Sequence, residues 1–339
     1  MDFTPDETAR EVAGLASAVL ESGAESARVQ QALAGTSGFD ETMWKAMAQA
    51  GLLGLALPPD AGGDGLGAVE VAGVLTAVGR QTLPLPALAT LALGVLPLVR
   101  LGGTRHLAGV ADGAVLTAAL ATMTLVNGSV TGRARNVPYA AQAQRMLVAT
   151  EAGVAVLDPG TDGVELDRTT TSTGAPGYTV TCTRVAPLDL LPGSISDLEI
   201  CALAGAAAVA DGVVAGALEL TTAHVRSREQ FGRPLATFQA VAQQLADVYI
   251  VARTMHLAAT TVNWQLTRDR PSATDFEIAG YWLAAEVPPA LQTCHHLHGG
   301  LGVDITYPLH RYSAHAKDLA RLVGGAERRL DRIASCTSR

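Results

Sequence analysis

Residues 226–239 read RSREQFGRPLATFQ and join two long helical patterns. Gly232 frees the backbone at this corner, and Pro234 cannot lie in the interior of a helix. Arg228 and Phe231 suit a ligand with an anionic part and a flat part, because guanidinium matches phosphate oxygens and an aromatic ring can stack on a base. The same spacing also fits a plain interhelical turn with a solvated arginine and a core phenylalanine.

The segment after this turn carries apolar residues at alternating steps of three and four, as in a helix buried within a bundle. These residues are Phe238, Val241, Leu245, Val248, Ala252, Met255, Ala259 and Val262. Similar patterns over residues 278–293 and 307–322 predict about four helices between Ser196 and the C-terminal end. We therefore expect a helical bundle over residues 194–339.

The first third of the chain also has helical periodicity, over residues 6–21, 40–50, 69–80 and 85–101. A turn-rich loop, residues 53–67, interrupts it. The glycine-rich run in this loop (GGDGLG, residues 62–67) lacks a surrounding βαβ unit, so we do not predict a dinucleotide site there. An all-helical domain is expected over residues 1–115.

Between these helical parts the pattern changes to short runs of Val, Thr and Leu broken by turn residues such as Asn127-Gly128. Residues 146–150, 154–157 and 178–181 predict strands, and the first two are close enough to form a hairpin. A small β domain over residues 116–193 follows. The fold class is therefore α+β, with a helical domain, a middle β domain and a C-terminal bundle.

Composition excludes several kinds of partner. The chain has 339 residues, a net charge of −8 and a pI near 5.5, so nothing favours binding to nucleic acid. Its four cysteines are scattered and free of metal or redox spacing, which suits the cytoplasm. The apolar runs 87–99 and 200–214 are interrupted and too short to span a bilayer. We expect a cytoplasmic protein without a membrane span.

The pattern Arg-x-x-Phe-Gly-x-Pro-Leu-x-x-Phe-Gln resembles a signature of the acyl-CoA dehydrogenases, flavoenzymes that desaturate CoA thioesters. A second element, HLHGGLG at residues 296–302 followed by Tyr307-Pro308, is similar to another signature of this family. The resemblance covers essentially the whole chain. It is greatest to the non-catalytic type of subunit in the α2β2 actinobacterial enzymes that shorten sterol side chains.

The resemblance implies that both elements reach across a subunit interface to the adenine and pyrophosphate of a neighbour's FAD. It assigns this role to Arg228, Gln230, Phe231, Leu235, Phe238, Gln239, His296, His298, Gly299 and Gly300. It also implies an acyl-CoA substrate, a homologous partner subunit and an electron-transfer flavoprotein as acceptor.

Two features of the catalytic machinery are missing. The family's catalytic glutamate corresponds to Val323, which cannot take a proton, and the alternative position on the preceding long helix corresponds to Ala202. Glu199, one turn earlier, is the remaining candidate base in this chain. The loop that lies against the flavin ring in the family is also absent, because Thr117–Leu120 is followed at once by residues 121–128.

Three functions stay open. The chain can complete the FAD site of a catalytic partner, it can be a flavin-free structural or acyl-CoA-binding protein that stabilises a partner, or it can act alone through Glu199. The histidines at 295, 296 and 298 lack the carboxylates or cysteines that would complete a metal shell, so no metal site is predicted. We favour the first function, because the neighbour-facing residues are kept and the ring-facing ones are lost.

Overall fold

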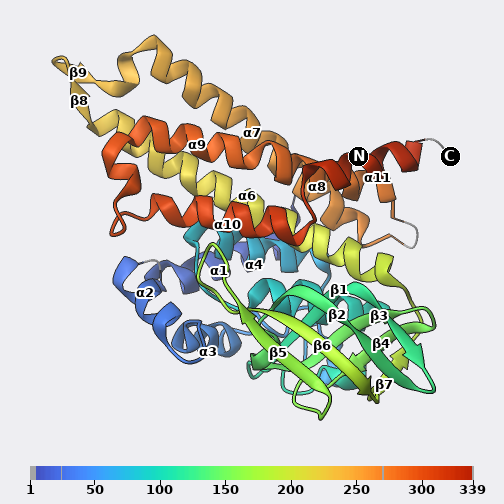
Figure 1. Cartoon of the computed structure of the whole chain (residues 1–339). Helices are drawn as coiled ribbons and strands as arrows, with labels where there is room; N and C mark the ends of the chain where they lie inside the picture. The colour runs from blue at the N-terminus through green and yellow to red at the C-terminus, as the bar shows by residue number, and fades with distance from the viewer. Residues whose placement is uncertain (1–4, 24, 269–270, 338–339) are drawn as a thin grey trace.

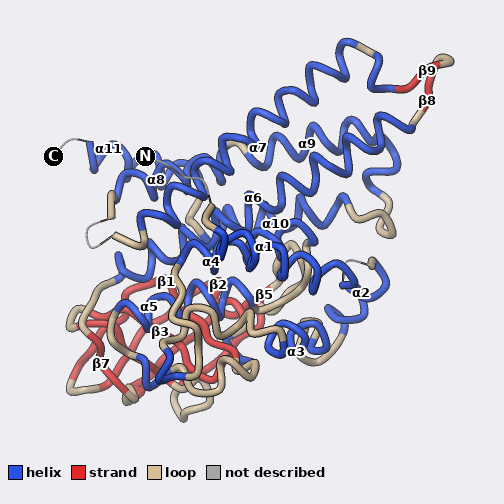
Figure 2. The backbone as a smooth tube through the Cα atoms, turned by 180° about the vertical axis from the view of Figure 1, so that it is seen from behind, coloured by secondary structure: helices blue, strands red, loops and turns tan. Residues whose placement is uncertain are grey.

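The chain changes from helices to strands at Val115 and returns to helices at Ile195. The computed structural model describes residues 5–23, 25–268 and 271–337. In Figure 1 the long C-terminal helices lie above the sheet, and Figure 2 shows the N-terminal helices packed against both. This order of elements agrees with the α+β expectation.

The N-terminal part is helical, as predicted. Its helices are α1 (Glu7–Leu20), α2 (Ser26–Ala34), α3 (Glu41–Gln49), α4 (Ala68–Gln81) and α5 (Leu96–Arg100). Asp6 caps α1 by accepting a hydrogen bond from the Ala9 N–H at 2.8 Å, and Asp40 caps α3 through the Met43 N–H at 2.9 Å. The predicted helix over 85–101 is instead a π-helical segment, Leu88–Val95, followed by α5.

The middle of the described chain forms a seven-stranded sheet in the order β5-β6-β2-β1-β3-β4-β7. The strands are β1 (Val115–Val126), β2 (Ser129–Pro138), β3 (Ala143–Thr150), β4 (Gly153–Leu157), β5 (Val164–Thr169), β6 (Gly177–Val185) and β7 (Asp189–Leu191). Strands β1 and β3 are parallel, and the other neighbours are antiparallel. Met146 lies opposite Leu157, so the predicted β3–β4 hairpin is confirmed.

Strand β1 continues without a loop to the tight turn at Asn127-Gly128, where both residues have positive φ (50° and 74°). Such a pair of positive φ angles is typical of a two-residue hairpin turn. The segment that follows Leu120 is therefore strand, and it pairs with β2 through Thr124–Thr131.

The C-terminal part contains α6 (Ile195–Ser227), α7 (Gln239–Gln265), α8 (Ala273–Ala285), α9 (Val287–His298), α10 (Leu309–Leu322) and α11 (Ala326–Thr337). The bundle is thus larger than the four helices expected. The predicted helix over 278–293 is broken at Glu286, because Pro288 and Pro289 start a new helix and cannot continue the old one. The pattern gave no separate prediction for α11.

Helix α6 is the centre of the molecule. It is long and apolar enough to cross a membrane, but 89% of its most apolar window is buried inside the protein. Glycines let α4 cross it closely: a Cβ on Gly79 would lie 2.2 Å from the Val209 carbonyl oxygen, and one on Gly212 would lie 2.0 Å from that of Thr76. The rest of the bundle packs around this crossing.

The apolar stripe of α7 is buried only along part of its length. Val248, Ala252, Met255, Ala259 and Val262 are buried, whereas the earlier members Phe238, Val241 and Leu245 are only half-buried. The start of α7 extends beyond the neighbouring helices, at the upper left of Figure 1. Because the apolar stripe is continuous in the sequence, its half-buried part at the start of α7 has the apolar residues that are typical of a surface packed against another helix.

Candidate functional site

The turn between α6 and α7 is a small hairpin built on Arg228, the residue that follows the end of α6. The Arg228 N–H donates to the His224 carbonyl at 2.8 Å, and the Arg228 carbonyl accepts from the Leu235 N–H at 2.8 Å. Strands β8 (Glu229–Gln230) and β9 (Arg233–Pro234) pair between these anchors. Phe231 stands at the tip with φ of 55°, a conformation that costs a non-glycine residue free energy.

This hairpin presents its predicted ligand groups to solvent. Phe231 is 92% exposed, and Arg228 is exposed with its guanidinium free of hydrogen bonds and ion pairs to the described residues. Phe238 is half-buried, with the Arg233 guanidinium 4.1 Å above its ring and Phe231 edge-on at 6.2 Å. An exposed aromatic ring in a strained backbone conformation is typical of a surface that binds a partner or a ligand.

The remaining predicted residues of this element follow the same trend. Gln230 and Gln239 are exposed, and Leu235 is half-buried beside the hairpin. The element therefore offers a guanidinium, two amides and an aromatic ring on one exposed surface. This set can hold a phosphate oxygen and flank a base.

The second element lies at the end of α9. Gly299 has φ of 60°, and a Cβ on Gly299 or Gly300 would meet nothing within 4 Å, so this turn is open to an approaching ligand. His296 is exposed on the last turn of the helix. His298 differs from the expectation that it contacts the cofactor. The residue is 6% exposed, and both ring nitrogens have partners inside the chain, at the Cys294 carbonyl and the Tyr307 hydroxyl.

The structure brings the two elements together. The rings of His224, on the last turns of α6, and His298 stack with centroids 4.4 Å apart. Both turns consequently lie at one end of the bundle, at the left of Figure 1. His295 donates to or accepts from Ser313 at 2.8 Å, so the three neighbouring histidines face different surroundings. Among the described residues no cluster could hold a metal ion.

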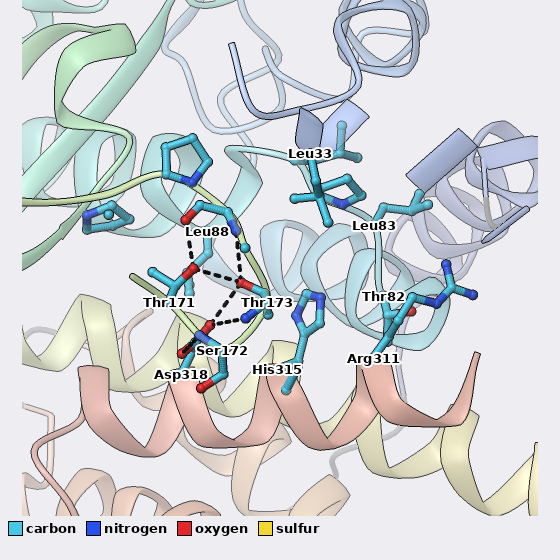
Figure 3. Close-up of a pocket in the computed structure, with 18 of the residues that line it drawn as sticks. Leu33, Thr82, Leu83, Leu88, Thr171, Ser172, Thr173, Arg311, His315 and Asp318 are labelled. Carbon is cyan, nitrogen blue, oxygen red and sulfur yellow. Dashed lines mark hydrogen bonds between the residues drawn. The ribbon is translucent and has the colours of Figure 1, made fainter. Parts of the chain in front are cut away.

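A cavity of about 470 Å³ lies elsewhere, where the three parts of the chain meet. Its walls come from α2, the turn after α4, the end of β2, the loop before β6 and α10, and no residue of β1 lines it. Figure 3 shows His315 pointing from α10 into this space, between the 171–173 loop and Leu83. Burial lowers the pKa of His315 to about 4, so the ring is neutral at pH 7.

Asp318 fixes one wall of this cavity. Its carboxylate accepts hydrogen bonds from the backbone N–H groups of Ser172 and Thr173, at 2.8 and 2.9 Å, and from the Thr173 hydroxyl at 2.9 Å (Figure 3). The Arg321 guanidinium is 3.0 Å away. The carboxylate is thus occupied by internal partners.

None of the three positions considered for a catalytic base lines the cavity. Val323 is buried at the C-terminal end of α10, and Ala202 is buried within α6. The Glu199 carboxylate is buried and ion-paired with Arg328 at 2.8 Å and Arg332 at 2.9 Å, both on α11. The carboxylate is thus held in ion pairs with α11 and is not part of the cavity wall.

The residues present fit one end of FAD and not the other. The exposed guanidinium, aromatic ring and open glycine turn match the pyrophosphate and adenine. The chain's own cavity does not match the isoalloxazine ring of a working flavoenzyme, because Asp318 is already occupied, β1 contributes nothing and no glutamate lines the space. When bound, FAD supplies the hydride acceptor that no side chain provides.

Comparisons with known proteins agree with this class of fold and site. Residues 6–107 match the acyl-CoA dehydrogenase N-terminal domain, and residues 204–336 match the acyl-CoA dehydrogenase C-terminal domain. Acyl-CoA dehydrogenase FadE28 of Mycobacterium tuberculosis is 43% identical over 98% of this chain and 97% of its own length. The chain belongs to the acyl-CoA dehydrogenase family, whose enzymes are FAD-dependent oxidoreductases.

Solved structures show the same relationship. A variant of the Tcur3481–Tcur3483 steroid ACAD superposes with a TM-score of 0.92 at 32% identity, covering 98% of each chain. The ChsE4-ChsE5 complex from Mycobacterium tuberculosis gives a TM-score of 0.92 at 29% identity, over 100% of this chain and 99% of that one. The predicted resemblance to the heteromeric steroid type is therefore confirmed.

Sequence reasoning missed three residues that the geometry makes important: His224, His315 and Asp318. His224 lies four residues before Arg228, one helical turn from the end of α6, and this spacing was the available signal. No sequence signal marks the role of Asp318, because its loop partners Ser172 and Thr173 are more than 140 residues away.

Proposed function

We propose that this chain is the FAD-completing subunit of a heteromeric acyl-CoA dehydrogenase. It contributes Arg228, Phe231, His296 and the Gly299-Gly300 turn to the adenine and pyrophosphate of FAD held by a homologous catalytic subunit. The partner supplies the catalytic glutamate and the flavin-ring site. The enzyme introduces an α,β double bond into a bulky CoA thioester, a steroid side chain being the class that the relatives' names favour.

The observation that carries this proposal is the position of the two turns. Both lie at the exposed end of the bundle, outside the residues that line the chain's own cavity, and this position supports a role toward a molecule held largely by another chain. The half-buried start of α7 and its exposed Tyr249, Ile250 and Leu257 supply an apolar surface for that chain.

The names of the relatives support the same assembly. The ChsE4-ChsE5 complex contains two differently named chains, and Tcur3481–Tcur3483 is likewise a pair. We propose an α2β2 heterotetramer that works in the cytoplasm in steroid catabolism and passes electrons to an electron-transfer flavoprotein. The chain alone is then colourless and assembles poorly, and the complex holds two FAD molecules.

The test is to co-express the chain with a homologous acyl-CoA dehydrogenase subunit and measure bound FAD against protein concentration. Two FAD molecules per tetramer agree with the proposal, whereas four show that this chain also holds a flavin ring. Arg228→Ala removes a charge-assisted contact worth about 1.5–3 kcal/mol, which lowers FAD affinity roughly ten- to hundredfold. Arg228→Lys restores part of it, since lysine keeps the charge but not the fork.

Arg226→Ala is the matched control, because Arg226 is an exposed arginine on the same helix end. FAD affinity unchanged by Arg228→Ala, or lowered equally by Arg226→Ala, contradicts the trans contact. The alternative is a flavin-free structural or acyl-CoA-binding subunit that only stabilises a partner. The cavity of about 470 Å³ supports its acyl-CoA-binding form, and this alternative predicts that neither substitution changes FAD affinity.

A further inference from the structure

Two imidazole rings lie face to face beneath the proposed cofactor turns. The His224 and His298 rings have centroids 4.4 Å apart and an interplanar angle of 18°. His298 Nδ1 is 2.8 Å from the Cys294 carbonyl oxygen, which can only accept, so Nδ1 carries the hydrogen. Nε2 then accepts from the Tyr307 hydroxyl at 3.1 Å. The His298 ring is consequently fixed in orientation and tautomer.

This stack joins the backbone of both turns. The His224 carbonyl accepts the Arg228 N–H at 2.8 Å, so His224 is bonded directly to the residue proposed to hold pyrophosphate. His298 is followed directly by Gly299-Gly300 and lies two residues after His296. These ring faces are therefore one of the contacts that join the end of α6 to the end of α9.

We propose that His224 and His298 are positioning residues that hold the Arg228 hairpin and the Gly299-Gly300 turn at the separation needed for one dinucleotide. The inference rests on the proposed function and deepens it, because it names what makes the site rigid. Neither ring touches the cofactor. A ligand contact made by two separate turns is strong only if their spacing is fixed before binding.

Charge supports this role. Burial lowers the pKa of both His224 and His298, and the nearby Arg228 and His295 lower them further. The pKa of His295 is lowered in turn by burial and by the nearby His310 and Lys317. Apart from Tyr307, the titratable groups named here are therefore cations or groups that become cations on protonation. The pair is therefore neutral near pH 7. Protonating His298 places a hydrogen on Nε2, which removes the acceptor for Tyr307 and leaves the stack with a charge.

The experiment measures FAD affinity of the co-expressed complex by flavin fluorescence between pH 5 and 8. His224→Ala removes the stack and is expected to lower FAD affinity about two- to tenfold at pH 7.5. His224→Phe keeps a flat ring that cannot be protonated, so it should retain most of the affinity and show a weaker loss toward low pH. Thr222→Ala, on the same helix and away from His298, is the control and should change neither.

Tyr307→Phe is a milder test of the same arrangement, because it deletes the hydroxyl that donates to His298 and keeps the aromatic ring. We expect a smaller loss of FAD affinity than in His224→Ala. This variant still tests the inference if His224→Ala fails to assemble. FAD affinity unchanged in His224→Ala and Tyr307→Phe while Arg228→Ala weakens it overturns this inference and leaves the proposed function standing. No effect of any of the three variants contradicts both. A loss in His224→Phe equal to that in His224→Ala also overturns the stacking role.

Discussion

One oxygen of Asp318 accepts both the N–H and the hydroxyl of Thr173, each at 2.9 Å. The other oxygen accepts the Ser172 N–H at 2.8 Å. Asp318, a residue of the C-terminal bundle, thus accepts the hydrogen bonds that the 171–173 loop of the β domain would otherwise donate to water. The loop held in this way forms one wall of the interdomain cavity. The two parts of the chain are fastened together at this point.

We expect Asp318→Ala to release this loop. Three hydrogen bonds to a carboxylate are lost, and because the carboxylate is partly exposed we expect a cost of about 1–3 kcal/mol in the free energy of unfolding. Chemical denaturation gives the stability, and hydrogen exchange at Ser172 and Thr173 should accelerate. Asp167→Ala, on the exposed face of β5, is the control and should change stability by less than about 0.5 kcal/mol. Unaltered exchange at the two amides would show that the loop is held by its other contacts.

The close crossing of α4 and α6 can be tested by adding a methyl group at Gly79. Gly79→Ala places a methyl group against the Val209 carbonyl, and because backbone cannot move aside this should destabilise the protein by about 1–3 kcal/mol or more. Gly14→Ala, on the exposed face of α1 with nothing within 4 Å, should instead stabilise it by up to about 1 kcal/mol. Thermal unfolding of the two variants distinguishes steric from propensity effects, and equal shifts would contradict the close crossing.

A substitution of Glu199 distinguishes a structural role of this residue from a catalytic one. Glu199→Gln removes the charge that pairs with Arg328 and Arg332 and should destabilise the protein by about 1–3 kcal/mol, because the carboxylate is buried. The exposed pair of Glu219 and Arg80 offers the control: Glu219→Gln should cost about 0–1 kcal/mol. Turnover per bound flavin in the complex should be unchanged in both variants. A collapse of turnover with intact flavin in Glu199→Gln would return the base to this chain.

The pH dependence of stability tests His315. The folded-state pKa, about 4, is below the ordinary value of 6.5, because burial disfavours the charged ring. A histidine with a lowered pKa gives full stability at pH above 6.5 and loses it as the pH falls toward 4, since the unfolded chain binds the proton more readily. Relative to His315→Gln, the natural chain should lose up to about 2 kcal/mol by pH 5. Parallel stability curves for the two proteins would show that the ring is not desolvated.

Local chemistry accounts for what the sequence predicted correctly. The helices expected over residues 6–21 and 40–50, the β3–β4 hairpin and the buried part of the α7 stripe each depend on residues a few positions apart, so spacing alone identifies them. The Arg228 and Gly299 elements were likewise visible as motifs. The split at Glu286 was less apparent, because apolar periodicity continues across it and only Pro288 and Pro289 mark the break.

Tertiary structure decided which of those residues face solvent and which face each other. The family resemblance implied a cofactor contact for His298 as well as for His296, but the fold buries the first and exposes the second. It also pairs Glu199 with α11, Asp318 with the 171–173 loop and His224 with His298. Glu199 and Arg328 are 129 positions apart, Asp318 and Thr173 are 145 apart, and His224 and His298 are 74 apart. These contacts form only when whole helices pack against one another. The energy of that packing is distributed over many side chains, so no local sequence pattern predicts it.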